Sequence, residues 1–295
     1  MEKTLGNKLI ILVFVLPAVL IFTCFVIYPL LPTIYYSLHN FNGIKNGGFV
    51  GLKNYLDNLK DPVFWNSNLN SLKVLAVQYV VAGPLSFIFA VMIHRQSPGV
   101  RRFFKTTSFI PSVLNVSVIC LMWKMMLQPD WGLLDIFLKN VGLQSLIKTW
   151  LVDPSTAMWV IAGVCLWQYI GYNMMFFYGG LKAIPGSYYE AASIEGANPL
   201  QQTLYITIPL LQEIIKFVLI LSTAGTLSLF GHVTILTNGG PGDLTRTLVF
   251  QLYYHAFSLS DFGGADAMTV IFAFEGMLLL WLISRFIARE RIIYT

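Results

Sequence analysis

The amino-acid sequence predicts an all-α membrane protein with six transmembrane helices in one domain, residues 1–295. Apolar residues make up 56% of the chain and charged residues only 11%, whereas a soluble protein carries roughly a quarter charged residues. The mean hydropathy of +0.67 excludes an intrinsically disordered chain. Runs without charge recur at a length of about 20 residues, which is what a membrane-spanning helix requires.

The candidate spans follow directly from these runs. They cover about residues 9–28, 74–93, 106–127, 158–181, 217–236 and 267–284. No small-x-small cleavage site follows the first run, so we expect a retained span there and not a signal peptide. Since no Pro/Gly/Ser linker divides the chain, one membrane domain is the simplest interpretation.

Basic residues between the spans predict the orientation, because Lys and Arg are more frequent in cytoplasmic loops. The densest group runs from Arg95 to Lys105, and Lys182 and Lys216 flank the segment after the fourth span. Both termini and residues 182–216 are therefore expected on the cytoplasmic side. The net charge of +5 is attributed to this orientation and not to nucleic-acid binding.

The cytoplasmic segment 185–209 is moderately polar, and its first half predicts a short helix. Ser187 and Glu190 have the spacing of a capping box, in which each side chain bonds the other's backbone amide. Gly196 suits a left-handed residue that ends the helix about two turns later.

The second half of this segment predicts another helix. Asn198 is a favourable N-cap, Pro199 then takes the first helical position, and Gln201 completes a second capping pair. Pro209 is expected to end or kink the helix before the fifth span. The segment is therefore interpreted as a helix, a tight turn and a helix.

Two interpretations of the helix pair remain open on its local chemistry. Its small residues allow close approach by a partner's backbone, while Glu190 and Glu195 offer carboxylates to a partner's Arg or Lys. Alternatively, Glu190 only caps its own helix and the alanines are simply good helix formers.

The run Glu190-Ala-Ala-Ser-Ile-Glu-Gly-Ala, followed by Ile206-Thr-Ile-Pro-Leu210, closely resembles the EAA loop of permease subunits in binding-protein-dependent ABC importers. Ile208 stands where that family usually has Leu. The runs Phe49-Val-Gly-Leu-Lys-Asn-Tyr55 and Thr237-Asn-Gly-Gly-Pro241, with Pro62 to Trp65, are similar to the carbohydrate branch, specifically the maltose-type first permease.

This resemblance implies the type I ABC importer permease fold, in the plasma membrane of a prokaryote. It also implies four kinds of partner: a second homologous permease, two cytoplasmic ATPase subunits, an extracellular solute-binding protein and membrane lipid. The ATPase would grip the coupling segment, with Glu190 meeting a basic residue. The coupling residues so implied are Glu190, Ala191, Ala192, Glu195, Gly196 and Ala197.

The chain itself is not expected to be an enzyme. No Lys-Thr pair follows a Gly, so a phosphate-binding Walker A loop is absent, and so are a zinc HExxH motif and a Gly-x-Ser-x-Gly elbow. We therefore expect no catalytic residue, no metal site and no cofactor here, with ATP and Mg²⁺ bound by partner subunits.

A candidate substrate path lies in the fourth and fifth spans, where aromatic faces and hydrogen-bonding groups recur at helical spacing, as in carbohydrate sites. The resemblance places the residues of the fourth span at or beside the sugar site of the maltose-type relative. The predicted path residues are Gln168, Tyr169, Tyr172, Ser222 and Thr226. Ordinary helix packing remains the alternative for each of them.

Two further ionisable residues lie in spans. Glu275 in the sixth span would be costly against lipid, so it is either a path-lining carboxylate or hydrogen-bonded to a neighbouring helix. His232 is expected to be a packing residue with its hydrogen bond satisfied.

The expected function is import of a carbohydrate, either an oligosaccharide or a sugar derivative, by an ATP-driven ABC importer of which this chain is the permease. One alternative is the same architecture importing glycerol-phosphate or a polyol; path-facing Arg or Lys would favour the phosphate. A less favoured alternative is an ion-coupled secondary transporter with Glu275 as its coupling site, although the internal repeats expected there are not seen.

Overall fold

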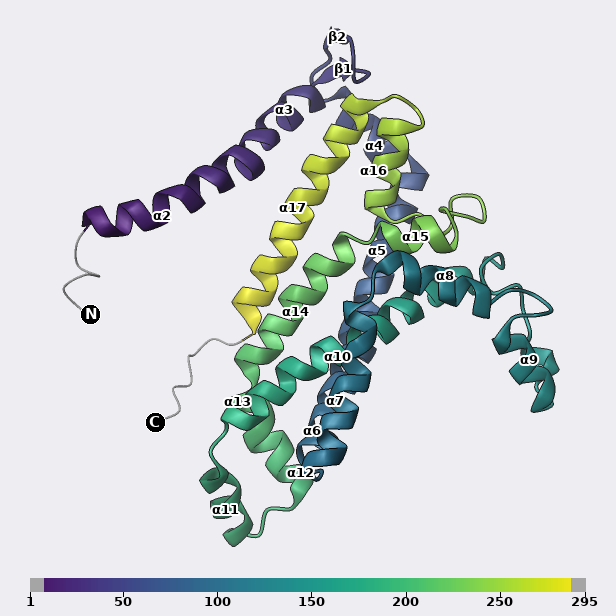
Figure 1. Ribbon diagram of the computed structural model, residues 1–295. Helices are drawn as coiled ribbons and strands as arrows, with labels where there is room; N and C mark the ends of the chain where they lie inside the picture. Colours follow the sequence, from purple (N-terminus) through teal and green to yellow (C-terminus); the bar gives the residue numbers. More distant parts are fainter. Residues whose placement is uncertain (1–7, 288–295) are drawn as a thin grey trace. The chain divides into compact units, whose positions relative to one another are not determined.

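The computed structural model describes residues 8–287, and these residues are mostly helical, as predicted (Figure 1). Among these described residues, four helices are long and apolar enough to cross a membrane, and two bent helix pairs raise the number of spans to six if each pair is one span. The continuous helices are Leu12–Ser37, Pro62–His94, Ala157–Ala183 and Phe262–Phe286.

The chain divides into two compact units, which are described separately. The first contains the chain up to Pro62 together with Leu252–Phe274, and the second contains Val63–Gln251 and the chain from Glu275 onward. Helices α16 (Leu248–Phe257) and α17 (Phe262–Phe286) contribute residues to both units. The organisation as one domain stays a prediction.

The first unit begins with an apolar helix and continues into a small hairpin. The elements are α2 (Lys8–Phe22), η1 (Thr23–Ile27), α3 (Tyr28–Ser37), β1 (His39–Phe41), β2 (Asn46–Phe49) and α4 (Lys53–Lys60). The amide of Asn54 donates to the carbonyls of Ser37 and His39 at 2.8 and 2.9 Å, which fixes α4 to the base of the hairpin. Most apolar side chains of α2 and α3 from Leu12 onward are exposed, as expected for a helix that faces lipid.

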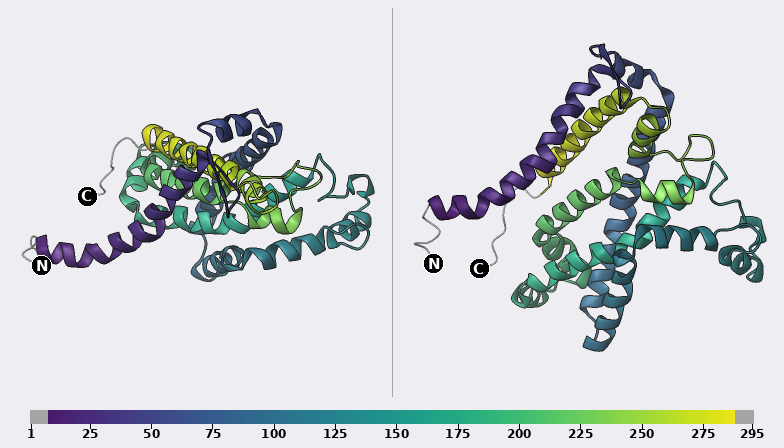
Figure 2. Two further views of the ribbon diagram at one scale, coloured as in Figure 1. Left: turned by 90° about the horizontal axis from the view of Figure 1, so that it is seen from above. Right: turned by 45° about the horizontal axis from the view of Figure 1, so that its top comes forward.

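The second unit is built around the long helix α10 (Ala157–Ala183), which lies against α6 and α7 (Figures 1 and 2). Its other elements in the first half of the chain are α5 (Pro62–Val77), η2 (Gln78–Ala82), α6 (Gly83–His94), α7 (Pro98–Val113), α8 (Val116–Met126), α9 (Leu133–Asn140) and η3 (Gln144–Leu146). Those after α10 are α11 (Gly186–Ile194), α12 (Pro199–Gln202), η4 (Thr203–Thr207), α13 (Ile208–Leu210), α14 (Gln212–Leu227) and α15 (Gly231–Leu236).

Small residues allow the helices of this unit to approach closely, a common device where helices pack within a membrane. Gly171 of α10 lies against the backbone of α7, where an added Cβ would meet Ser108 O at 1.7 Å. Gly180 lies against the side chains of Leu211 and Ile214, which an added Cβ would meet at 2.6 and 2.9 Å. The unit also contains two clusters of buried apolar side chains, one around Ile161 and Val233 and one around Met174 and Leu211.

Within residues 8–287, three π-helical segments interrupt the long helices, and each ends two residues before a proline. The segments η1, η2 and η4 precede Pro29, Pro84 and Pro209 respectively. A proline inside a helix lacks an N–H donor, and its ring clashes with the carbonyl four residues earlier. The wider π turn moves that carbonyl, so the helix continues through the proline.

The structure corrects two predicted spans, because residues 106–127 and 217–236 are not continuous helices. In the first, α7 and α8 meet at 98°, and Asn115 Oδ1 accepts from Ser117 N at 2.8 Å, so Asn115 caps a new helix. In the second, α14 ends at Leu227 and α15 begins at Gly231. Thr247 Oγ1 donates to the Leu229 carbonyl in this break at 2.8 Å, which satisfies a group that a continuous helix would have used.

Candidate functional site

The predicted coupling segment forms two short helices, but the first does not begin as expected. Pro185 is the N-cap of α11, with φ −62° and ψ 138°, and no side chain caps this end. Ser187 already lies inside the first turn, where it cannot take the non-helical backbone angles of an N-cap. The predicted capping box between Ser187 and Glu190 is therefore wrong.

The predicted left-handed end of this helix is confirmed. Gly196 has φ +82°, a conformation that costs little only for glycine. Its amide donates to Ser193 O at 3.1 Å, and the Ala197 amide donates to Ala192 O at 2.9 Å. This pair of hydrogen bonds is a Schellman motif, and it turns the chain sharply toward the second helix.

The predicted second cap is also confirmed. Asn198 Oδ1 accepts from Gln201 N at 2.9 Å, while Gln201 Oε1 accepts from Asn198 N at 2.8 Å. Gln202 Nε2 then donates to Ser193 Oγ at 3.0 Å and to Ala197 O at 3.1 Å, which joins the two helices across the turn. The turn is thus fixed by hydrogen bonds on both sides.

The chain changes direction where the coupling segment meets α14. The helix that runs from Pro199 to Leu210 meets α14 at 68°, two residues after Pro209, as the predicted kink requires. Tyr189 of α11 and Thr207 of η4 are hydrogen-bonded through their hydroxyls at 3.0 Å. This hydrogen bond joins α11 to η4, and η4 leads through α13 into α14.

The two carboxylates of the coupling segment are directed toward solvent. Glu190 and Glu195 are exposed, and in the part of the chain that the structure describes neither has an ion-pair partner. Ile194, at the last position of α11, is 86% exposed although it is a large apolar side chain. The end of α11 therefore presents charged and apolar side chains to solvent together.

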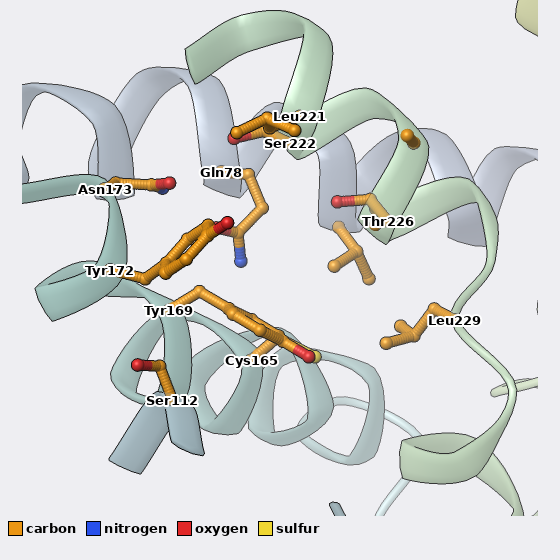
Figure 3. Close-up of a pocket in the computed structure, with 13 residues that line it drawn as sticks. Gln78, Ser112, Cys165, Tyr169, Tyr172, Asn173, Leu221, Ser222, Thr226 and Leu229 are labelled. Carbon is orange, nitrogen blue, oxygen red and sulfur yellow. The ribbon is translucent and has the colours of Figure 1, made fainter. Parts of the chain in front are cut away.

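A cavity of about 460 Å³ lies between η2, α10 and α14, within the range of about 300–1,000 Å³ for ligand sites (Figure 3). Four of the five predicted path residues line it: Tyr169 and Tyr172 from α10, and Ser222 and Thr226 from α14. The two tyrosine rings lie along one side, and Thr226 faces them from the opposite helix (Figure 3).

Gln168 and Glu275 do not line this cavity. Gln168 is buried, and its Oε1 lies 2.7 Å from His232 Nε2, so it holds α10 to α15. His232 therefore has a hydrogen-bond partner, as expected of a packing residue. Glu275 Oε2 accepts from Asn68 Nδ2 at 2.8 Å, which fits the predicted alternative of a carboxyl bonded to a neighbouring helix.

Sequence reasoning missed several residues of the cavity, notably the polar side chains of Gln78, Ser112 and Asn173. Gln78 lies within an apolar run, where neither charge nor periodicity distinguished it; its one signal was Pro84 in the same run, which marks a helix irregularity. None of the described residues that line the cavity carries a charge. The cavity thus combines aromatic rings, amides and hydroxyls, a chemistry suited to a neutral polyhydroxyl ligand.

The fold and the site together define a multi-span helical membrane protein that has a cavity among its helices and a pair of short helices, α11 and α12, between two of its spans. Residues 82–291 match the family described as the inner membrane component of binding-protein-dependent transport systems, and the chain belongs to this family. Because this family is a transport component, the chain is a permease of the inner membrane and not a catalytic enzyme.

Relatives of known name agree with this assignment. The chain is 34% identical to the probable ABC transporter permease YurN of Bacillus subtilis, over 90% of this chain and 91% of the relative. It is 33% identical to the lactose transport permease LacF of Rhizobium radiobacter, over 82% and 80% of the two chains. It is 31% identical to the sn-glycerol-3-phosphate permease UgpA of Agrobacterium fabrum, over 90% of each.

A solved structure has the same fold. A chain of the bacterial alginate ABC transporter, crystallised with its pentasaccharide-bound periplasmic protein, superposes with a TM-score of 0.82. The alignment covers 97% of this chain and 96% of that chain at 17% identity. The type I permease architecture predicted from the sequence is confirmed.

Proposed function

We propose that this chain is the membrane permease of an ATP-driven importer for a neutral carbohydrate. The observation that carries the proposal is the uncharged cavity, in which two tyrosines face amide and hydroxyl groups. Aromatic faces pack against the apolar side of a sugar ring, and amides and hydroxyls bond its hydroxyl groups. Relatives named for lactose, arabinooligosaccharides and starch degradation products support the same substrate class.

The cavity chemistry favours a neutral substrate over an anionic one. A phosphate or carboxylate group in a buried path needs Arg or Lys to offset its desolvation, and no described lining residue is basic. The alternative that remains is sn-glycerol 3-phosphate, which one relative is named for. A substrate panel that includes both kinds of solute distinguishes the two.

The proposal includes three kinds of protein partner: a second, similar permease, two cytoplasmic ATPase subunits that bind ATP and Mg²⁺, and an extracellular binding protein. The alginate transporter, which has the same fold, was crystallised with a periplasmic binding protein. In this arrangement both termini lie in the cytoplasm with the coupling segment. The exposed carboxylates of Glu190 and Glu195 and the left-handed turn at Gly196 form the surface that docks on the ATPase.

Transport by the reconstituted complex tests this function. Proteoliposomes with the ATPase subunits and internal ATP are supplied with the binding protein and labelled lactose, maltotriose or sn-glycerol 3-phosphate. ATP-dependent uptake of a neutral sugar is expected, without inhibition by a proton uncoupler. Uptake of the phosphate ester alone would contradict the substrate class, and uptake without ATP would contradict the transporter class.

Docking is tested by co-purification of the ATPase. Glu190→Arg and Gly196→Asp are expected to weaken co-purification while membrane insertion is retained, because the first reverses a charge and the second strains a backbone at φ +82°. Glu213→Arg is the matched control, since Glu213 is an exposed carboxylate in the first turn of α14 and not in α11. Full coupling in both coupling-segment variants would refute the docking surface.

A further inference from the structure

The side-chain nitrogen of Gln78 is a buried donor that is not used within the described part of the chain. Gln78 is 4% exposed, and its Nε2 atom has no hydrogen-bond partner among residues 8–287. A buried hydrogen-bond donor that lacks an acceptor costs free energy, and most buried polar groups in native proteins are paired. The packing of the helices therefore does not explain why a glutamine occupies position 78.

The side chain is aimed into the cavity. Figure 3 shows the Gln78 nitrogen directed into the space between the two tyrosines of α10 and Thr226 of α14. Gln78 is the first residue of the π-helical segment η2. Val74, four residues earlier on α5, lines the same cavity, so the regular helix that leads into η2 brings both side chains to this side.

A neighbouring contact holds η2 in place. The Tyr79 hydroxyl is hydrogen-bonded to Thr223 Oγ1, and Thr223 donates in turn to the Leu219 carbonyl at 2.7 Å. Thr223 is fully buried on α14, the helix that also carries Ser222 and Thr226. The position of Gln78 is therefore fixed relative to the hydroxyl groups on the other side of the cavity.

We propose that Gln78 is a specificity-determining residue that donates a hydrogen bond from Nε2 to a hydroxyl oxygen of the neutral carbohydrate in the path. The inference rests on the proposed function, and it adds a third helix to the two that the sequence assigned to the path. The ligand satisfies the donor that the fold leaves unpaired, and loss of that bond slows passage of the sugar.

The test compares Gln78→Met with Gln168→Met in the complete complex. Both changes remove a buried amide of similar size, but among the described residues Gln168 is hydrogen-bonded to His232, whereas Gln78 Nε2 has no partner. Gln78→Met is expected to lower lactose or maltotriose uptake at saturating binding protein about tenfold, the equivalent of about 1.4 kcal/mol. Its thermal unfolding temperature is expected to stay the same or to rise.

The control is expected to behave in the opposite way. Gln168→Met lowers the unfolding temperature, because His232 is left without its partner, while uptake per assembled complex changes little. Uptake by Gln78→Met within twofold of the wild type would overturn the inference. So would a fall in its unfolding temperature as large as that of Gln168→Met, since Gln78 would then support the fold. Failure of the wild-type complex to take up any neutral sugar would instead contradict the proposed function.

Discussion

Because α10 and α7 lie so close together, Gly171→Ala is expected to destabilise the second unit. A Cβ at this position would lie 1.7 Å from Ser108 O and 2.3 Å from Ser108 C, both of which are backbone atoms. Ordinary van der Waals contact begins at 3.4 Å. No rotation of a side chain relieves the overlap, so the two helices have to move apart.

The magnitude follows from two opposing effects. Overpacking of a well-packed interior costs about 1–3 kcal/mol, and a clash between backbones belongs at the upper end of that range. Alanine regains about 1 kcal/mol because its helix propensity exceeds that of glycine. The expected net loss of stability is therefore about 2 kcal/mol.

Gly179→Ala in the same helix is the matched control, because an added Cβ there meets nothing within 4 Å. Thermal unfolding of the purified protein in detergent, followed by tryptophan fluorescence, compares the variants. Gly171→Ala is expected to unfold at a lower temperature than the wild type, and Gly179→Ala at the same or a higher one. Equal unfolding temperatures for the two variants would refute the close approach of α10 to α7.

Three further outcomes are expected. Asn198→Ala removes the capping box and costs about 1 kcal/mol locally, so hydrogen exchange of the amides in residues 199–207 speeds up; unchanged exchange would contradict the cap. Glu275→Gln keeps the contact with Asn68, so ATP-driven uptake is retained, whereas an ion-coupled mechanism through this carboxylate predicts its loss. Hydrogen bonds from His255 and from the Gly264 amide lower the pKa of Asp261. The stability that Asp261 contributes is therefore complete above the ordinary aspartate pKa of about 3.9 and lost as the pH falls through its lowered folded-state pKa. The difference in unfolding temperature between wild type and Asp261→Asn should shrink over that acid range, and a difference independent of pH would contradict the assignment.

The sequence predicted the helical membrane class and the approximate positions of the spans because hydropathy and length alone decide these features. It did not predict the break at Asn115, since an apolar window averages over a single N-capping residue. The Asn198 cap and the Gly196 turn were predictable because their chemistry is local. Ser187 is not the cap because Pro185 takes the N-cap position and the helix already begins at Gly186.

The cavity was predicted only in part, for a related reason. Tyr169 and Thr226 lie on regular helices, so helical spacing identified their faces. Gln78 is a single amide within an apolar run, so no recurring polar residue at helical spacing marked the face that it shares with Val74. Gln168 has the right spacing, but a partner on α15 takes up its side chain. Only tertiary packing decides between these two glutamines.

ATP-driven passage of a neutral carbohydrate through the cavity of the second unit is tested most directly by uptake of labelled lactose and maltotriose. Proteoliposomes that contain the complete complex are compared with and without internal ATP. Uptake is expected to require ATP and the ATPase subunits and to fall about tenfold in Gln78→Met. Uptake that persists without ATP, or that collapses with a proton uncoupler, would contradict ATP-driven transport by this chain.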